Sequence, residues 1–172
     1  MSQREFDIIN RYFRDSGLGF ATDGVDLGIG DDCALLSVGA DYQLAVSMDL
    51  LQEGVHFPAS ADPELLGQRA LAVNLSDLAA VGAEPLCFTL GLSLPEPEQA
   101  WLEGFSKGLL HMAKQFGCPL VGGDLIQGVR QVAIQVHGRV PAGQALRRAG
   151  ARPGKPRPAY RPIGRLQLSP GG

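Results

Sequence analysis

The chain has 172 residues, of which 45% are hydrophobic and 19% are charged, and its formal net charge is −3. This composition is typical of a globular protein with one sizeable core, and no apolar run approaches the ~20 residues that a membrane-spanning helix needs. Because the N-terminus also lacks the apolar stretch of a signal peptide, the sequence predicts a cytoplasmic protein that does not engage a membrane. The cysteines Cys33, Cys87 and Cys118 are too widely spaced for a C-x-x-C pair, so we expect buried thiols rather than disulfides or a zinc site.

Positive charge is concentrated at the C-terminus, where residues 152–172 contain five basic side chains and no acidic one. The rest of the chain has ten basic and eighteen acidic side chains, a net charge of −8. A body this acidic is a poor nucleic-acid binder, so no nucleic-acid partner is expected. Residues 152–172 are also rich in proline and glycine without apolar periodicity, which predicts a disordered tail after a single domain at residues 1–151.

The spacing of apolar residues predicts alternating helices and strands. Phe6, Ile9 and Phe13 recur at helical spacing, which predicts a first helix near residues 3–14 that ends before Gly17. A short strand follows, and then the main elements, namely strands near 42–48, 88–94, 118–122 and 131–140 and helices near 63–81 and 102–116. This order predicts an α/β (α+β) fold in which a mixed four-stranded sheet carries its helices on one face.

The predicted strands at 88–94 and 131–140 have side chains suited to partial burial on both faces. In the first of them, apolar side chains alternate with small or polar ones such as Thr89 and Ser93. A sheet of this kind needs a cover on the face opposite the helices, which favours packing against a second copy of the chain. We therefore expect a homodimer.

Acidic side chains occur at four separated points of the chain, in residues 28–32, 47–49, 74–77 and 122–124. Carboxylates that converge without a cation repel one another, whereas magnesium ions and a polyphosphate remove this repulsion. The pattern therefore predicts magnesium-assisted phosphoryl transfer. Taken singly, each segment also has a structural interpretation: a glycine turn capped by carboxylates at 28–32 and 122–124, and a solvated strand end at 47–49.

Asp77 is the most informative of these carboxylates, because its predicted helix has no wholly polar face. Helical angles place it between Leu66, Ala70 and Val81, so we expect a buried carboxylate, which is costly without a cation. Asn74, one turn earlier, could orient that carboxylate or contact a ligand. The alternative is a buried hydrogen-bonded pair of Asn74 and Asp77 without any metal.

Few side chains near these acids in the sequence could contact a substrate through positive charge or a ring nitrogen. Arg147 and Arg148 follow the last predicted strand and could reach phosphates, although either could equally be a surface arginine. His56 lies a few residues beyond Asp49 and could touch a substrate, although a lone histidine is more often structural.

Several motifs together resemble the thiamine-monophosphate kinase family. They are LGIGDDCALL at 27–36, EGVHF at 53–57, ALAVNLSDLAA at 70–80, GGD at 122–124 and GRVP at 138–141. The resemblance covers roughly residues 3–154 in order. It implies the fold of the amino-terminal domain shared with aminoimidazole ribonucleotide synthetase and selenophosphate synthetase, in which two subunits join their sheets into a barrel.

The resemblance also implies the reaction and its residues. The reaction is transfer of the ATP γ-phosphoryl group to thiamine monophosphate, which needs no acid or base from the protein because the acceptor phosphate is already ionised. The implied positions are Asp32, Ser47, Met48, Asp49, Asp77 and Asp124 for magnesium, Gly123, Asp124 and Arg148 for ATP, and His56 for the substrate. Asp31 is adjacent and assists.

The chain departs from the family pattern in two respects. Met48, Leu50 and Leu125 stand where the family commonly has threonine, which removes a hydroxyl ligand but not a backbone carbonyl. Beyond residue 154 the family continues into a second domain, whereas this sequence turns into the basic tail, so we expect a truncated or frameshifted chain without the carboxy-terminal domain. Two alternatives to the kinase therefore stay open: a catalytically incomplete nucleotide-binding remnant, and a related ATP-using synthetase.

Overall fold

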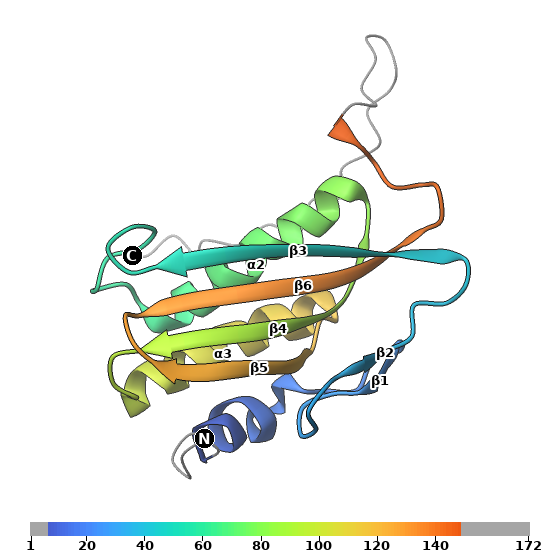
Figure 1. The fold of residues 1–172 in the computed structure, drawn as a ribbon. Helices are drawn as coiled ribbons and strands as arrows, with labels where there is room; N and C mark the ends of the chain where they lie inside the picture. Colours follow the sequence, from blue (N-terminus) through green and yellow to red (C-terminus); the bar gives the residue numbers. More distant parts are fainter. Residues whose placement is uncertain (1–6, 149–172) are drawn as a thin grey trace, which may run out of the picture.

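The structure is a computed structural model that describes residues 7–148 (Figure 1). The predicted tail at 152–172 lies outside the described residues. The elements in chain order are η1 (Asn10–Leu18), β1 (Val25–Leu27), β2 (Leu35–Leu36), β3 (Tyr42–Gln52), α2 (Pro63–Val81), β4 (Glu84–Leu94), α3 (Gln99–Phe116), β5 (Leu120–Gln127) and β6 (Gln131–Pro141). Among these residues, no helix is both long and apolar enough to cross a membrane.

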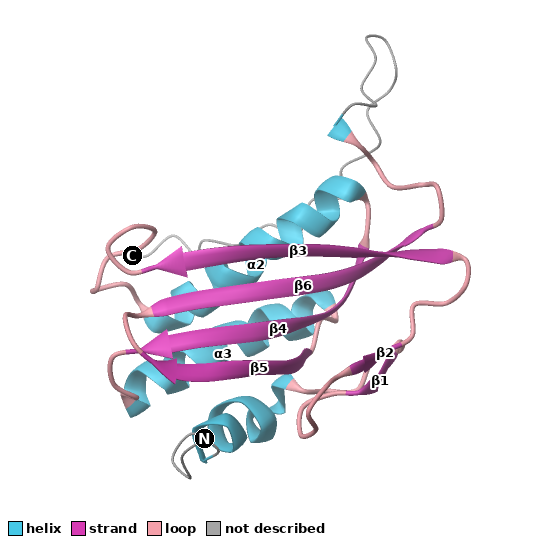
Figure 2. Cartoon of the chain, viewed as in Figure 1, coloured by secondary structure: helices cyan, strands magenta, loops and turns pink. Residues whose placement is uncertain are grey.

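Four strands form one mixed sheet in the order β3-β6-β4-β5. The β4–β5 pair is parallel and the other two pairs are antiparallel, so β3 and β5 are the edge strands. Helices α2 and α3 both lie behind the sheet in Figure 2 and cover the same face. The predicted mixed four-stranded sheet with helices on one face is thus confirmed, and the four strands of this chain form an open sheet, not a closed barrel.

The ends of α2 follow from its sequence. Asp62 caps the N-terminus by accepting a 3.0 Å hydrogen bond from the backbone N–H of Leu65, and Pro63 occupies the first turn, where its missing N–H costs nothing. Gly82 ends the helix with a φ of 75°, a conformation that glycine adopts without strain. The prediction of a helix at 63–81 is correct at both ends.

Helices α2 and α3 pack closely because glycines lie between them. A Cβ atom at Gly67 would collide with the carbonyl oxygen of Phe105, and one at Gly108 would collide with that of Glu64. The core beneath these helices consists of apolar side chains from α2, α3 and the covered face of the sheet, with Leu71, Phe88 and Phe105 fully buried.

The first helix differs from its prediction. The chain is helical from residue 7, continues as the π-helical segment η1, and ends later than predicted, with Gly17 at a φ of 85° and Leu18 fully buried. Residues 1–6, where the predicted helix begins, lie outside the described residues. The apolar spacing thus located the helix but not its last turn, because burial of Leu18 in the core depends on tertiary packing.

The face of the sheet opposite the helices is open along β3. Leu44, Val46, Met48 and Leu50 lie on this face and are 44–58% exposed. The small β1–β2 sheet packs against the starts of β4 and β5, where Leu86, Cys87 and Val121 form a second buried cluster. Cys87 and Cys118 are buried as predicted, but Cys33 is exposed, so its predicted burial is wrong: it follows the loop at 28–32 rather than a strand of the core.

Candidate functional site

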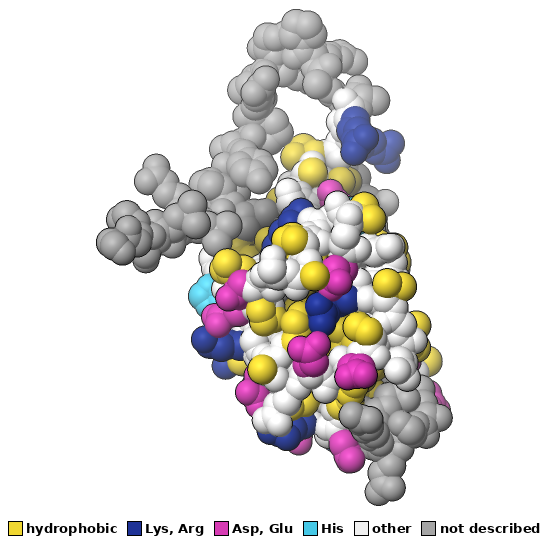
Figure 3. Space-filling view, turned by 90° about the vertical axis from the view of Figure 1, so that its left-hand side faces the viewer, with side chains coloured by type: hydrophobic (Ala, Val, Ile, Leu, Met, Phe, Trp, Pro, Cys, Tyr) yellow, Lys and Arg dark blue, Asp and Glu magenta, His cyan; other side chains and the backbone are white. Residues whose placement is uncertain are grey.

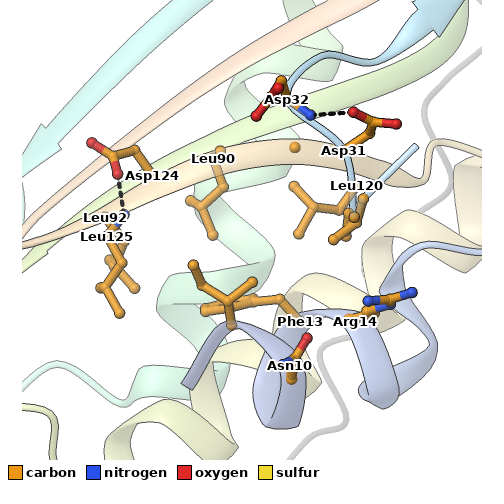
Figure 4. A pocket seen from close by; sticks show the side chains of 15 residues that line it. Asn10, Phe13, Arg14, Asp31, Asp32, Leu90, Leu92, Leu120, Asp124 and Leu125 are labelled. Carbon is orange, nitrogen blue, oxygen red and sulfur yellow. Dashed lines mark hydrogen bonds between the residues drawn. The ribbon is translucent and has the colours of Figure 1, made fainter. Parts of the chain in front are cut away.

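A cavity of about 540 Å³ lies between η1, the loop at residues 28–32 and the β5 edge of the sheet (Figure 4). Its floor is apolar and comes from four strand residues, Leu90, Leu92, Leu120 and Leu125, with Phe13 of η1 opposite them. Its volume falls within the range of pockets that hold small molecules. The polar groups around this floor are Asn10, Arg14, Asp31, Asp32 and Asp124.

The loop at 28–32 presents two carboxylates to the cavity. Gly30 has a φ of 124°, which allows the chain to turn here, and the backbone N–H of Asp32 donates a 2.8 Å hydrogen bond to Oδ1 of Asp31. Asp32 itself accepts no hydrogen bond from the rest of the described chain. Its carboxylate oxygens therefore remain available to a ligand or cation in the cavity.

Asp124 adds a third carboxylate from β5. Its Oδ1 accepts a 3.0 Å hydrogen bond from the N–H of Leu125, and Figure 4 shows its side chain projecting away from Leu92 and Leu125, at the rim rather than the floor. The preceding residue must be glycine, because a Cβ atom at Gly123 would collide with the carbonyl oxygen of Leu90. Close approach of the β4 and β5 backbones thus fixes the place of this carboxylate.

A second acidic group lies at the other edge of the sheet, between β3 and α2. The hydroxyl of Ser47 donates a 2.6 Å hydrogen bond to Oδ2 of Asp77, and the backbone N–H of Asp49 donates a 3.0 Å hydrogen bond to Oδ1 of Asn74. Asn74 is buried and anchors itself through a 2.9 Å hydrogen bond to the carbonyl of Ala70. Ser47 and Asp49 share a face of β3, as the alternation in the sequence predicts.

The predicted burial of Asp77 is wrong, because its side chain is exposed and the neighbouring Asn74 is the buried polar residue. The helix also does not pair Asn74 with Asp77, since each contacts a different residue of β3. The reason is the position of α2 relative to the sheet. β3 is an edge strand, so a side chain on the flank of α2 that faces β3 lies at an open rim, which helical periodicity alone does not reveal.

The two acidic groups are separated by the width of the sheet. Strands β3 and β5 lie three interstrand spacings apart, which corresponds to roughly 14 Å. The register places Asp124 level with Gly91, Ala133 and Leu50, so it lies level with the β3 group along the strands. Among residues 7–148, no three His, Cys, Asp or Glu side chains gather closely enough to hold a metal ion by themselves.

Three predicted site residues lie outside both groups. Met48 is on the open sheet face, Arg148 is exposed after β6, and His56 is exposed in the loop after β3. His56 is held in place, because its Nδ1 accepts a 3.0 Å hydrogen bond from the N–H of Gln52 and its carbonyl accepts one of 2.9 Å from Arg69.

The start of the His56 loop is fixed by an ion pair. The guanidinium of Arg130 is 10% exposed, lies 2.6 Å from Glu53 and stacks over the ring of Trp101 at 5.1 Å. Figure 3 looks onto this end of the sheet, where acidic and basic side chains lie close together among hydrophobic ones. The loop is thus positioned by a largely buried charge pair, whose partners are costly to separate.

Sequence reasoning missed the contribution of η1 to the cavity. Asn10, Phe13 and Arg14 line it from this helix, more than one hundred residues before Asp124 in the chain. No motif marks these side chains, and only the spacing of Phe6, Ile9 and Phe13 indicated which helix face is turned inward.

Comparison with known proteins gives a consistent result. The family model for "AIR synthase related protein, N-terminal domain" matches residues 30–140. Thiamine-monophosphate kinase of Escherichia coli (strain K12) is 48% identical over 157 residues, which is 90% of this chain and 47% of that protein. The chain therefore spans about half the length of the curated relatives that it matches.

Two solved structures share the fold. Thiamine-monophosphate kinase from Stenotrophomonas maltophilia K279a is 46% identical with a TM-score of 0.73, and the match covers 86% of this chain and 46% of that one. The structure described as "AaThiL complexed with AMPPCP and TMP" is 30% identical with a TM-score of 0.63, covering 86% and 44%. Together with the family model, which matches more than half of the residues, these similarities show that this chain belongs to the family of AIR synthase related proteins, whose N-terminal domain it contains.

Proposed function

We propose that the protein is a thiamine-monophosphate kinase, which transfers the γ-phosphoryl group of ATP to thiamine monophosphate. The observation that carries this proposal is the 48% identity to the Escherichia coli kinase across 90% of the chain. The cavity at the β5 edge supports it, because an apolar floor with a polar rim suits a nucleotide, which has an apolar base and a charged phosphate chain.

The reaction forms a bond between an oxygen of the acceptor phosphate and the γ-phosphorus of ATP, and breaks the bond from that phosphorus to the β–γ bridging oxygen. ADP leaves with the electron pair of the broken bond, and thiamine diphosphate is the other product. Because the nucleophile is already an anion, the protein has to hold two polyanions in line rather than to move a proton.

The donor set of the site fits magnesium. Asp31, Asp32 and Asp124 bring hard oxygen ligands to the cavity, and Ser47, Asp49 and Asp77 bring a second set at the other edge of the sheet. Magnesium commonly takes only one or two carboxylates and completes its coordination with phosphates and water, so a protein-only cage is not required. Bound there, magnesium would neutralise the phosphate charge that the carboxylates otherwise repel.

We propose Asp32 and Asp124 as magnesium ligands at the cavity and Asp49 and Asp77 as magnesium ligands at the β3 edge. We propose Gly123 and Arg148 as contacts of ATP and His56 as a contact of the substrate.

A second copy of the chain is the proposed cover of the open sheet face. Four apolar side chains of β3 are 44–58% exposed in a single chain, and an exposed apolar patch of this kind commonly marks an interaction surface. Pairing of two such sheets would bury these side chains in a homodimer.

Sedimentation equilibrium tests this proposal. A dimer is expected, and a monomer for the wild-type chain at the concentrations used for assay would count against it. Val46→Lys, which places a charge in the middle of that face, is expected to yield a monomer with unchanged secondary structure.

Two alternatives remain distinct in their predictions. A nucleotide-binding protein without catalysis would bind magnesium–ATP but form no thiamine diphosphate. A related ATP-using synthetase would hydrolyse or transfer phosphate from ATP and ignore thiamine monophosphate. The kinase proposal predicts that thiamine monophosphate stimulates consumption of ATP.

The deciding experiment is thiamine diphosphate formation by the purified chain with ATP, magnesium and thiamine monophosphate. Asp49→Asn should abolish product formation, whereas Asp41→Asn, a matched change of an exposed carboxylate in the turn before β3, should not. Product that disappears only in Asp49→Asn would establish the kinase. Nucleotide binding without product would favour the non-catalytic alternative, and ATP consumption that ignores thiamine monophosphate would favour the synthetase.

A further inference from the structure

We propose that Arg14 is an additional phosphate-binding residue of the cavity, so that η1 supplies the positive charge that the acidic rim lacks. This inference rests on the proposed nucleotide-binding function of the cavity. No motif of the sequence assigns a role to Arg14, and the residue enters the site only through the packing of η1 against the β5 edge.

The geometry of the loop at 28–32 makes room for this guanidinium. A Cβ atom built on Gly30 would lie 3.3 Å from Cζ of Arg14 and 3.4 Å from its Nη2, so the guanidinium rests against a position of the loop that has no side chain. Figure 4 shows Arg14 reaching from η1 toward the side of the cavity on which Asp31 lies. The glycine thus serves both the turn, with its φ of 124°, and the place of the arginine.

The guanidinium is held by packing rather than by an acidic partner. In the described part of the chain, Arg14 forms no ion pair, although Asp31 and Asp32 line the same cavity. Arg11, three residues earlier on the same helix, differs: it lies 3.6 Å from Glu103 and over the ring of Tyr12 at 5.2 Å. Among residues 7–148, the guanidinium of Arg14 therefore has no carboxylate partner that would compete with a ligand, whereas that of Arg11 has Glu103 nearby.

Charge balance explains why the cavity needs such a residue. Its rim carries three carboxylates, and a triphosphate that enters brings further negative charge. Magnesium offsets part of this charge, but a guanidinium binds phosphate oxygens directly through two parallel hydrogen bonds. Since Arg14, Asp31 and Asp32 border the apolar floor of the same cavity, we expect them to meet the phosphate chain rather than the base.

The test is calorimetric titration of the full chain with magnesium–AMPPCP. Arg14→Gln is expected to weaken binding at least about tenfold, since a hydrogen bond to a charged group is lost. Arg14→Lys, which keeps the charge but not the planar fork, is expected to lie between wild type and Arg14→Gln. Arg11→Gln is the matched control, and its affinity is expected to lie within about twofold of wild type. Adenosine, which has the base and sugar but no phosphate, is the control ligand, and its affinity in competition with AMPPCP should be the same for all variants.

The outcomes separate this inference from the function on which it rests. If wild type binds magnesium–AMPPCP and Arg14→Gln binds it equally well, Arg14 is not a phosphate ligand and the nucleotide site stands. If wild type does not bind magnesium–AMPPCP, both proposals are wrong. If Arg14→Gln loses adenosine binding as well, or unfolds at a lower temperature than Arg11→Gln, its role is structural and the inference fails.

Discussion

The two edges of the four-stranded sheet carry acidic side chains in different settings. At the β3 edge, Asp77 is already engaged by Ser47, and Asp49 is tied through its backbone to the buried Asn74. At the β5 edge, η1 and the loop at 28–32 enclose a cavity. Within residues 7–148, Asp31 and Asp124 there each accept a hydrogen bond only from the N–H of the next residue, and Asp32 accepts none. The comparison teaches that similar acidic motifs are not equivalent sites: at the β3 edge Asp77 is already bonded within the chain, whereas the β5 edge is ligand-ready, with its carboxylates bordering a cavity.

The strongest test of this difference is Asp124→Asn at the ligand-ready edge. The variant keeps the shape of the side chain but removes a charge from the cavity, so the affinity for magnesium–AMPPCP should fall by about 100-fold. Calorimetric titration measures the loss. An affinity within a few-fold of wild type would mean that the cavity carboxylates do not act through a cation.

Removing the helix side of the cavity should be nearly as damaging. Phe13→Ala deletes a side chain that is 5% exposed and joins η1 to the core, which is expected to lower the free energy of unfolding by about 3 kcal/mol and to abolish nucleotide binding. Urea denaturation gives the stability. The control is Leu65→Ala on α2, whose side chain is 63% exposed and whose loss should cost little. Wild-type nucleotide affinity in Phe13→Ala would show that η1 is not part of the site.

At the β3 edge, Asp77→Asn should have a smaller effect. Ser47 can still donate its hydrogen bond to the amide oxygen, so the fold should keep its stability, whereas the magnesium concentration that half-saturates nucleotide binding should rise about tenfold. Magnesium titration at fixed AMPPCP measures this. An unchanged magnesium dependence would assign the Ser47–Asp77 bond a purely structural role.

The smallest expected effect is a pH dependence of the free energy of unfolding. It concerns Cys87, on which the β1–β2 sheet packs. Burial raises the pKa of the Cys87 thiol to about 11 from a usual value of 9.0. The unfolded chain therefore loses this proton more readily, so the stabilisation is complete below pH 9 and declines as the pH rises toward 11. Denaturation at pH 8 and pH 10.5 measures the decline, which Cys87→Ala should reduce. Equal slopes for both proteins would show that the thiol is not protected in the folded state.

Local signals in the sequence were sufficient for most of the fold. Pro63 and Gly82 bound α2 because their backbone preferences act within one turn, and the alternation in β3 and β6 reports a sheet with one covered face. The strand β3 extends to Gln52 rather than stopping near residue 48, because its pairing with β6 continues and the acidic residues did not end it.

The site was less predictable because it depends on contacts between distant elements. The glycine and aspartate motifs indicated Asp32, Gly123 and Asp124, which the structure gathers at one cavity. Nothing in the sequence places Arg14 beside Gly30, and nothing indicates that α2 faces an edge strand at Asp77. Residue type is sufficient to nominate a ligand, but its exposure and its neighbours are properties of the packed chain.

The position of η1 also sets the order in which this site can be assembled during synthesis. Its inner side chains meet α3 and the strand that follows it, so the first helix of the chain waits for segments that leave the ribosome about one hundred residues later. The α2–α3 layer and the β4–β6 pairing join segments that lie closer together in the chain, and closing a long loop costs more entropy than closing a short one. A nascent chain that ends before β5 therefore has every acidic motif except Asp124 and no cavity to hold them, so nucleotide binding reports chains in which β5 has been made and η1 has packed against it.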